Sequence, residues 1–343
     1  MFLPLSNGQT MYYEIHGSSR VGAPTAVVLH GGPGAGLSRR TLKLFDLHVW
    51  RVVLYDQRGC GQSSPFGVAS LAHNTTHDLL DDMERLRKHL GVHAWYLTGG
   101  SWGATLALLY GEAYPKHVLG MLLRAVCLMD RTESAWLYEQ NGAAQVFPDA
   151  YAKFQEVLPV AVRNGSMEKI LKAYQQMLTS SNKAVQNRAA AAWTGYEDSV
   201  ISLVPKPPVY KGKRDLSVAI LENHYFQHGA WLAPDQIVRN THKLKDIPID
   251  VVHGRYDMIC PYRSVQTLAA KLPKLNVLRI DDGGHSGFFE TEAGYPSAGL
   301  SPLKGRPFLS SAQKGYIREI TDEIGRRCLK VPKHTTRKKS KRS

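Results

Sequence analysis

The sequence predicts an α/β fold in which a mostly parallel central sheet has helices on both faces and carries an inserted helical subdomain. Short apolar runs alternate with helix-like segments up to residue 127, and they do so again after residue 245. Such alternation is typical of a parallel sheet whose two faces are both covered. Between residues 128 and 245 the alternation stops, and helix-like segments follow one another. These observations indicate one α/β core that an insertion divides in two.

We therefore divide the chain of 343 residues into four parts. A chain of this length is too long for one compact layered domain without an inserted subdomain. Residues 1–127 are predicted to form the first part of the core, residues 128–245 a helical cap, residues 246–329 the second part of the core, and residues 330–343 a basic tail.

The first part of the core contains strand-like apolar runs separated by turns and helical segments. The first of these runs, at residues 11–16, is predicted to be an edge strand. The later helix has Asn74 or Thr75 as its N-cap and acidic residues in its first turns. Strands are predicted at 11–16, 25–29, 51–55, 94–98 and 118–126, and helices at 38–45, at 75–90 and directly after residue 103.

The cap and the second part of the core differ in their patterns. Helix-like segments rich in Ala, Gln, Tyr and Trp fill the cap up to a proline-rich break at residues 205–208. The alternation of strands and helices then returns. Cap helices are predicted within 136–140, 149–162, 169–179 and 183–193; the second part of the core has strands at 249–253 and 276–281 and helices at 264–272 and 311–327.

The net charge of +14 is unevenly distributed along the chain. Seven of the Lys and Arg residues lie between Lys330 and Ser343, without an acidic residue, so half of the excess charge is in the tail. Such a block is normally a solvated, disordered appendage, and the alternatives are a nuclear-type address or loose contact with a polyanion. We do not expect nucleic-acid binding, except weakly through residues 330–343.

The remaining composition favours a soluble cytoplasmic protein. The N-terminus lacks a basic segment followed by an apolar one, and no apolar run reaches the ~18 residues of a membrane span. The four cysteines are far apart and form no C-x-x-C pair, so neither a disulfide framework nor a zinc site is indicated. We expect no metal and no cofactor. The cysteines are Cys60, Cys127, Cys260 and Cys328.

The segment 99–103, Gly-Gly-Ser-Trp-Gly, has the pattern G-x-S-x-G and lies between a predicted strand and a predicted helix. In this context the central serine occupies a strained turn that exposes its hydroxyl at the N-terminus of the helix. Glycine is needed at residues 99 and 103 because a Cβ there would collide with the neighbouring strand or helix. Ser101 is therefore the predicted nucleophile.

A serine hydroxyl needs an imidazole to accept its proton and a carboxylate to orient that imidazole. Asp257 follows the predicted strand 249–253, and His285 follows Gly-Gly after the strand 276–281. The chain order Ser, Asp, His is the order of α/β-hydrolases. Asp281 and Asp282 are the rival carboxylates, although they are better placed to end the strand and shape its turn.

The negative oxygen of a tetrahedral intermediate needs hydrogen-bond donors. The backbone N–H of Trp102, the residue after the nucleophile, is expected to supply one of them. The loop 30–34, His-Gly-Gly-Pro-Gly, follows an early strand and should supply the other, from Gly32. The alternative for this loop is a phosphate-binding turn, but it lacks both the G-x-G-x-x-G spacing and the Walker lysine.

Longer motifs surround the predicted site residues. They are HGGPG at 30–34, YDQRGCGQSSP at 55–65, NTTHDLLDDMERLR at 74–87, GGSWGATLALLY at 99–110, LENHYF at 221–226, HGRYDMICP at 253–261 and GGHS at 283–286. With these motifs the chain resembles the proline iminopeptidase (prolyl aminopeptidase) family of α/β-hydrolases from about residue 11 to residue 290. The resemblance implies removal of N-terminal proline from peptides, with Ser101, Asp257 and His285 as the triad.

The resemblance also implies that two glutamates of the cap, Glu197 and Glu222, hold the free α-amino group of the peptide. A cationic amine in a pocket needs carboxylate partners, and a fixed amine site beside the serine makes an enzyme an exopeptidase. The alternative is that both are ordinary exposed helix residues, the commonest state of glutamate. We expect peptides with a free N-terminus as partners.

The sequence departs from the family in two places. The aromatic residues expected around the proline ring are replaced by Cys127 and Leu137, while Tyr138 remains. This change could alter the preference among proline, hydroxyproline and other small residues. The Gly- and Pro-rich stretch 291–310 is an insertion behind His285 that could border the substrate entrance or only decorate the surface.

Two other functions remain open at this point. The same scaffold and triad would serve an esterase or amidase for small acyl groups, and the altered pocket keeps that possibility open. The chain could instead be a polyanion-binding protein that acts through its basic tail.

Overall fold

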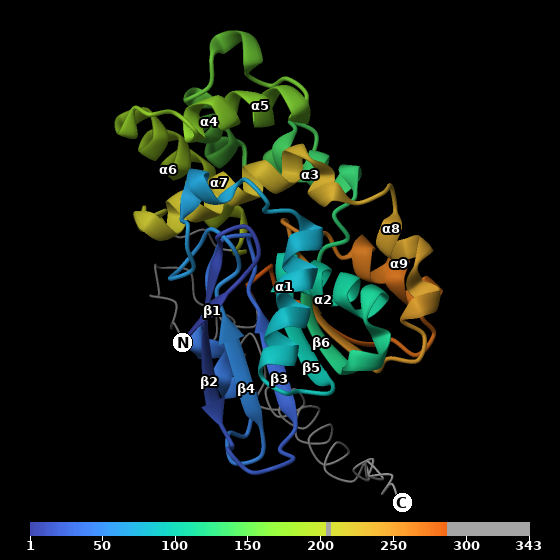
Figure 1. Ribbon diagram of the computed structural model, residues 1–343. Coiled ribbons are helices and arrows are strands. Elements are labelled where there is room, and N and C mark those ends of the chain that lie inside the picture. The colour runs from blue at the N-terminus through green and yellow to red at the C-terminus, as the bar shows by residue number, and fades with distance from the viewer. Residues whose placement is uncertain (204–206, 287–343) are drawn as a thin grey trace, which may run out of the picture.

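The computed structural model describes residues 1–203 and 207–286, and within them an eight-stranded sheet forms the centre of the molecule (Figure 1). The strand order is β1-β2-β4-β3-β5-β6-β7-β8. β1 and β2 run antiparallel to their neighbours, and the strands from β4 onward pair in parallel. The strands are β1 Phe2–Pro4, β2 Thr10–Gly17, β3 Thr25–Leu29, β4 Arg51–Tyr55, β5 Trp95–Ser101, β6 Val118–Val126, β7 Ile249–Gly254 and β8 Asn276–Ile280.

The prediction of an edge strand at residues 11–16 is wrong in one respect. These residues belong to β2, which lies inside the sheet because β1 pairs with its outer side. β1 has only three residues, too few for an alternating pattern to be recognised in the sequence. The other strands are confirmed to within three residues at each end, and the fold class is confirmed.

Both faces of the sheet are buried. Alternate side chains of β3 belong to two different apolar clusters: Val27 and Leu29 to one, Ala26 and Val28 to the other. Helices α1 (Thr76–His89) and α2 (Trp102–Ala113) cover the first face (Figure 1). Leu44, Phe45 and Trp50, from the segment between β3 and β4, cover the second. This explains the nearly uninterrupted apolar runs of the central strands.

Helix α1 begins as the sequence indicates. Thr75 is its N-cap, and the Thr75 side chain accepts a hydrogen bond from the backbone of Asp78, whose carboxylate accepts one in return from the backbone of Thr75. This capping box selects Thr75 over Asn74. The predicted helix 38–45 is a 3₁₀ helix, Arg39–Leu44. Further 3₁₀ helices span Gly67–Ser70, Pro115–His117, Ala143–Gln145, Val160–Val162, Gly229–Trp231 and Thr241–Lys243, and the short helices α8 and α9 span Gln236–Arg239 and Arg263–Lys271.

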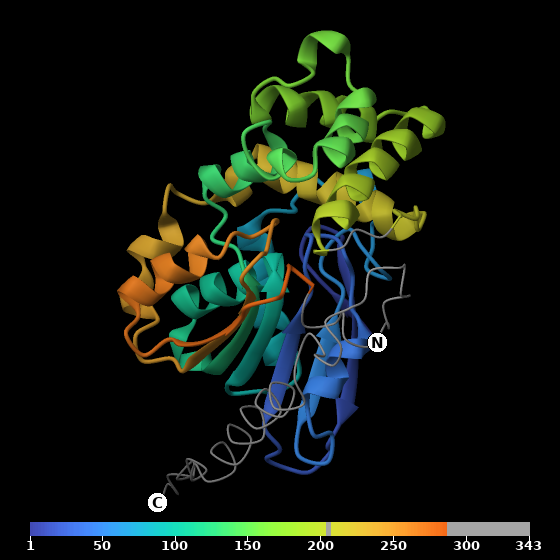
Figure 2. The ribbon, with the colours of Figure 1, turned by 180° about the vertical axis from the view of Figure 1, so that it is seen from behind.

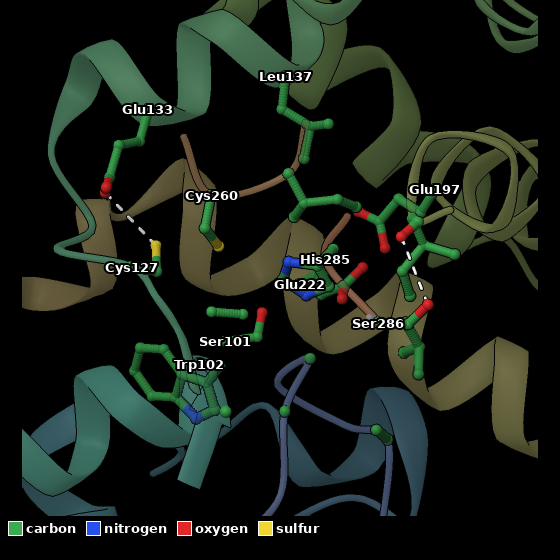
Figure 3. A pocket seen from close by; sticks show the side chains of 18 of the residues that line it. Ser101, Trp102, Cys127, Glu133, Leu137, Glu197, Glu222, Cys260, His285 and Ser286 are labelled. Atoms are coloured by element: carbon green, nitrogen blue, oxygen red, sulfur yellow. Dashed lines mark hydrogen bonds between the residues drawn. The ribbon is translucent and has the colours of Figure 1, made fainter. Parts of the chain in front are cut away.

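Of the six α-helices that the described residues form between β6 and β7, the first five make a layer above the carboxyl ends of the parallel strands (Figures 1 and 2). They enclose an apolar cluster of their own. Between this layer and the sheet is a cavity of about 310 Å³ (Figure 3). The helices are α3 Arg131–Tyr138, α4 Pro148–Glu156, α5 Met167–Leu178, α6 Lys183–Val200 and α7 Lys213–Gln227.

Four of these helices differ from the sequence-based expectation. α3 begins at Arg131 and not at residue 136, and α6 continues to Val200 beyond the predicted end at residue 193. α4 ends at Glu156 and not at residue 162, because Pro159 disfavours helical backbone at the residue before it. α7 was not predicted at all. Its side chains contact both the cap cluster, through Ala219 and Ile220, and the core cluster, through Tyr225, so α7 has no single apolar stripe.

Several expectations lie outside the described residues: the helix 311–327, the insertion 291–310 and the basic tail 330–343. The division of the chain into core, cap and tail stays a prediction. Within the part of the chain that the structure describes, no helix combines the length and apolar character needed to cross a membrane.

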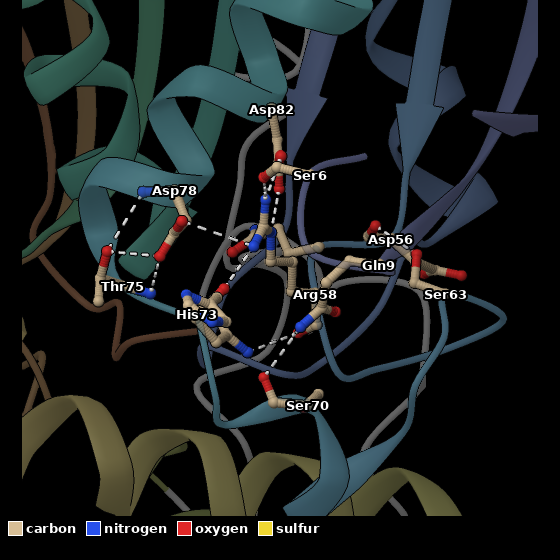
Figure 4. A network of polar contacts seen from close by, with 12 residues as sticks. Ser6, Gln9, Asp56, Arg58, Ser63, Ser70, His73, Thr75, Asp78 and Asp82 are labelled. Atoms are coloured by element: carbon tan, nitrogen blue, oxygen red, sulfur yellow. Dashed lines mark hydrogen bonds and ion pairs between the residues drawn. The ribbon is translucent and has the colours of Figure 1, made fainter. Parts of the chain in front are cut away.

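A buried ion pair fixes the loop that follows β4 (Figure 4). The fully buried Arg58 side chain donates from Nε and Nη2 to the two carboxylate oxygens of Asp82 in α1, at 2.6 and 2.7 Å. Arg58 also donates to the Ser6 hydroxyl at 2.9 Å and to the His73 carbonyl. Because the guanidinium is bound on several sides, the loop is held against α1.

Asp82→Asn should lower the free energy of unfolding by about 3 kcal/mol, because the substitution removes the carboxylate that binds two nitrogens of the buried Arg58 and leaves it with the more distant Asp78, at 3.6 Å. Urea unfolding measures the effect. Asp198→Asn is the matched control: it breaks the exposed pair with Lys211, 3.1 Å long, and should cost less than about 1 kcal/mol. Equal losses in the two variants would contradict a stabilising role of the buried pair.

Candidate active site

Ser101 lies at the tight junction between β5 and α2. Its backbone has φ 57° and ψ −128°, a strained conformation for a residue with a side chain. A Cβ on Gly103 would lie 2.1 Å from the carbonyl oxygen of Leu29, and a Cβ on Gly99 would lie 2.3 Å from that of Gly103. The predicted strained turn is therefore confirmed, together with the reason for its two flanking glycines.

Asp257 and His285 come from the loops after β7 and β8 and meet beside this turn. The His285 Nδ1 lies 2.9 Å from both carboxylate oxygens of Asp257. Because a carboxylate only accepts, Nδ1 carries the hydrogen and the Nε2 of neutral His285 is left as a proton acceptor.

The surroundings of Asp257 keep it ionised. Its side chain is fully buried, and the backbone N–H groups of Ile259 and Cys260 donate to it at 3.0 and 2.7 Å. Burial by itself would raise the pKa of Asp257, but the charge and hydrogen bond of His285, followed by the charge of His253 and the backbone donor of Cys260, hold the pKa below its usual value. The rival Asp281 is exposed and pairs with Arg279 at 2.6 Å, and Asp282 is exposed as well.

Ser101 and His285 border the same cavity between cap and core, and Figure 3 shows the Ser101 hydroxyl pointing into it. In the described part of the chain no hydrogen bond joins the two side chains, and such bonds often tighten only when substrate binds. Asp257 lies behind the His285 ring. Every other residue proposed from the sequence lines the cavity: Gly32, Trp102, Cys127, Leu137, Tyr138, Glu197 and Glu222.

The loop 30–34 lies directly against the serine turn. A Cβ on Gly31 would be 3.2 Å from the carbonyl oxygen of Gly100 and 3.5 Å from the Cβ of Ser101. Gly32 has φ 103°, in the region that favours glycine. Trp102 is the first residue of α2, so its N–H belongs to the positive end of the helix dipole. The assignment of Gly32 and Trp102 as oxyanion donors stays a prediction.

Glu197 in α6 and Glu222 in α7 face each other across the cavity wall, and neither is an ordinary exposed helix residue. Glu222 is 5% exposed, and its Oε2 accepts from the Trp193 indole at 2.7 Å. The Oε1 of Glu197 accepts from the Tyr138 hydroxyl at 2.8 Å. Two acidic side chains therefore meet in one largely buried place.

Burial raises the pKa of Glu222 well above its usual value, and the charge of Glu197 beside it raises it further. Burial also raises the pKa of Glu197, although its hydrogen bonds with Glu222 and Tyr138 oppose that effect. Because two neighbouring carboxylates repel each other, the pair is easier to protonate than a single exposed glutamate, and a cationic group beside both would relieve the same repulsion.

The remaining wall combines apolar and polar side chains, and it contains residues that we did not assign from the sequence. Phe226 packs against Tyr138, with ring centroids 5.5 Å apart. Phe226 and Cys260 belong to motifs that carried the family resemblance, and this membership could have identified them as cavity residues. No feature of the sequence marks Met129 in this way. The thiol of Cys127 donates to a carboxylate oxygen of Glu133 at 3.4 Å, so this side of the cavity is polar where the family resemblance implied an aromatic ring. The unassigned wall residues include Met129, Glu133, Phe226, Ile259 and Cys260.

Two groups of side chains among the described residues are close enough to reach one ion. The first group is Asp257, Cys260 and His285. Here the His285 Nδ1 and both Asp257 carboxylate oxygens are already hydrogen-bonded to each other. His30, Asp56 and Cys60 are the second. There the imidazole binds backbone groups of residues 31 and 57, and the carboxylate accepts from those of Leu37 and Gln62. These hydrogen bonds account for both groups without an ion.

Comparison with known proteins agrees with this geometry. The family model of the α/β hydrolase fold matches residues 24–292. A probable proline iminopeptidase of Leptolyngbya boryana is 39% identical over 301 residues, which cover 86% of this chain and 90% of that protein. The proline iminopeptidase of Neisseria gonorrhoeae is 38% identical over 288 residues, 84% of this chain and 90% of that protein.

Solved structures share the fold at low sequence identity. A proline iminopeptidase from Mycobacterium smegmatis has a TM-score of 0.54 and 16% identity, covering 95% of this chain and 99% of that one. An esterase from Exiguobacterium antarcticum has a TM-score of 0.53 and 15% identity, covering 94% and 98%. On the family model and the relatives at 38–39% identity, the chain belongs to the proline iminopeptidase family of α/β-hydrolases.

Proposed function

We propose that this protein is a serine aminopeptidase that releases N-terminal proline, or a similar small residue, from peptides. One observation carries the proposal: a buried pair of carboxylates, Glu197 and Glu222, lines the same cavity as Ser101 and His285. The relatives named above are proline iminopeptidases. A cytoplasmic location is part of the proposal and rests on the sequence alone.

The reaction follows from the roles of the side chains. His285 Nε2 accepts the proton of Ser101 as the hydroxyl attacks the carbonyl carbon of the N-terminal residue. The N–H groups of Gly32 and Trp102 donate to the oxyanion, and Asp257 stabilises the imidazolium. His285 then protonates the leaving amine, and a water molecule, deprotonated by the same imidazole, releases the acyl group from Ser101.

The carboxylate pair explains why such an enzyme would act at a chain end. The α-amino group of a peptide is a cation that can relieve the repulsion between Glu197 and Glu222, with charge-assisted hydrogen bonds to both. An acylated amine or an internal residue brings no such charge. A substrate without a free N-terminus brings no cation to the pair and gains none of these charge-assisted hydrogen bonds, so binding energy is reserved for the terminal residue.

A second candidate is a small-acyl esterase or amidase on the same scaffold. Cys127 and Leu137 in the cavity wall favour it, because they replace rings that would hold proline closely. Proline amide and an uncharged ester of matched size separate the two candidates. Polyanion binding through residues 330–343 concerns a segment outside the described residues and rests on the charge of that segment alone.

Ser101→Ala should abolish release of proline from prolyl fluorogenic amides, because the nucleophile is removed while the turn keeps its glycines. The measurement is a screen of N-terminal aminoacyl amides with wild type and variant, and circular dichroism checks folding. Proline release by the folded variant at the wild-type rate would contradict the assignment of the nucleophile.

Asp257→Asn should lower kcat by about 10³- to 10⁴-fold, because an amide can stabilise neither the required tautomer nor the imidazolium. Asp281→Asn is the matched control, since Asp281 was the rival carboxylate and pairs with Arg279 instead. The control should keep wild-type kcat. Similar losses in both variants would contradict the assignment of Asp257.

Glu222→Gln should reduce kcat/KM for prolyl amides by about 100-fold, the scale of a lost charge-assisted contact, and leave an uncharged ester nearly unaffected. Because the pKa of Glu222 is raised, the pair gains protons as the pH falls and attracts an amine less. In wild type, the ratio of amide to ester kcat/KM should therefore fall toward acid pH. The ratio removes pH effects on the triad, which both substrates use. Equal loss on both substrates would make Glu222 a structural residue.

A further inference from the structure

Gln57, in the loop after β4, connects the two backbone segments that border the serine hydroxyl. Gln57 is buried, with 2% of its surface exposed. The Gln57 Oε1 accepts from the indole Nε1 of Trp102 at 2.9 Å, and the Gln57 Nε2 donates to the carbonyl oxygen of His30 at 3.0 Å. Since an indole N–H only donates and a carbonyl only accepts, the orientation of the amide is fixed by its partners.

A third hydrogen bond joins the same loops. The backbone N–H of Gln57 donates to Nε2 of His30 at 3.0 Å, while Nδ1 of His30 donates to the carbonyl oxygen of Gly31 at 2.9 Å. This pattern requires neutral His30, and burial lowers the pKa of His30, which favours that form. The imidazole thus ties Gln57 to the glycine that lies against Ser101.

Gln57 is itself held rigidly from both sides. Asp56 accepts from the backbone of Leu37 and Gln62 at 2.7 and 2.8 Å, and Arg58 is bound to Asp82 (Figure 4). Because its neighbours in the chain are fixed, the Gln57 side chain can hold Trp102 and the loop 30–34 in fixed positions. The Gln57 side chain binds the Trp102 indole and the His30 carbonyl, and not the backbone N–H groups of Gly32 and Trp102 that are the proposed oxyanion donors. Its effect on those donors therefore passes through the protein.

We infer that Gln57 is a positioning residue for the oxyanion site, holding the loop 30–34 and the start of α2 at the separation that a tetrahedral intermediate requires. The inference rests on the proposed acyl transfer at Ser101. Gln57 touches neither substrate nor Ser101; it acts through His30 and through the indole of Trp102. Since such donors must lie within 2.7–3.1 Å of the developing oxyanion, a small displacement weakens the transition state more than the ground state.

Gln57→Leu removes both side-chain bonds and should lower kcat for a prolyl amide by about 10- to 100-fold, less than complete loss of an oxyanion donor. KM should change by less than about threefold. A prolyl boronic acid, which forms a tetrahedral adduct with a serine hydroxyl, should lose affinity in proportion to kcat/KM, whereas the affinity for L-proline should stay within about twofold.

Gln186→Leu is the matched control. Gln186 is also a buried glutamine whose two ends are used, donating to the Leu178 carbonyl at 2.7 Å and accepting from Lys183 at 3.0 Å, but it lies in the cap away from the cavity wall. It should lose stability without losing kcat. Trp102→Phe removes the indole donor and keeps the backbone N–H, so it should reduce kcat less than Gln57→Leu, and the double variant should lose no more than Gln57→Leu alone.

The outcomes separate this inference from the proposed function. If wild type hydrolyses a small-acyl ester and not prolyl amides, the proposed substrate is wrong, and the same variants are compared on the ester. If wild type is active and Gln57→Leu keeps kcat within about threefold, or raises KM instead, the positioning role is overturned. Should Gln57→Leu not fold, Gln57→Glu decides: it keeps an acceptor for Trp102, places an oxygen against the His30 carbonyl, and must lower kcat for the inference to stand.

Discussion

The close approach of α2 to the ends of β3 and β5 is the constraint on which the site depends. Ser101 can keep its strained backbone only because the two flanking glycines let the chain pass within a distance that a Cβ would block. That approach places the serine hydroxyl, the first N–H of α2 and the loop after β3 at one edge of the sheet. The strain is a local cost that the surrounding buried core compensates.

Burial has opposite consequences for the two groups of carboxylates around the cavity. Asp257 is buried beside an imidazole, and its pKa stays low because that partner can carry positive charge. Glu222 is equally deep beside another carboxylate, and its pKa is raised. The neighbour, and not the depth, therefore decides the protonation state. Asp257 can therefore stabilise an imidazolium at His285, and Glu222 with its neighbouring carboxylate can bind a cation that enters the cavity.

Much of this could be predicted from the sequence because the relevant signals are local. A buried parallel strand is a continuous apolar run, and the turn at Ser101 needs glycines at fixed offsets. What could not be predicted depends on partners distant in the chain. α7 is buried on more than one side and shows no one-sided stripe, and β1 is too short for a pattern. The contacts of Gln57 join residues 27 and 45 positions away, and no local rule reports them.

The position of α7 connects the motifs that the sequence shows separately. The Ser217 hydroxyl donates to the carbonyl oxygen of Gly34 at 2.9 Å, and a Cβ on Gly34 would lie 2.7 Å from the Ser217 carbonyl oxygen. At the other end of the helix, the Tyr225 hydroxyl donates to Asn74 at 2.9 Å.

Glu222 lies between these two anchors on the same helix. The helix that carries the proposed amine site therefore packs directly on the loop 30–34, which is proposed to bind the oxyanion. Because a peptide backbone spans a fixed length between its amino nitrogen and its first carbonyl, a rigid connection between the two sites would limit how far from the N-terminus the attacked carbonyl can lie. In this arrangement the packing of a single cap helix on a glycine loop would make the enzyme an aminopeptidase, and the triad alone would not.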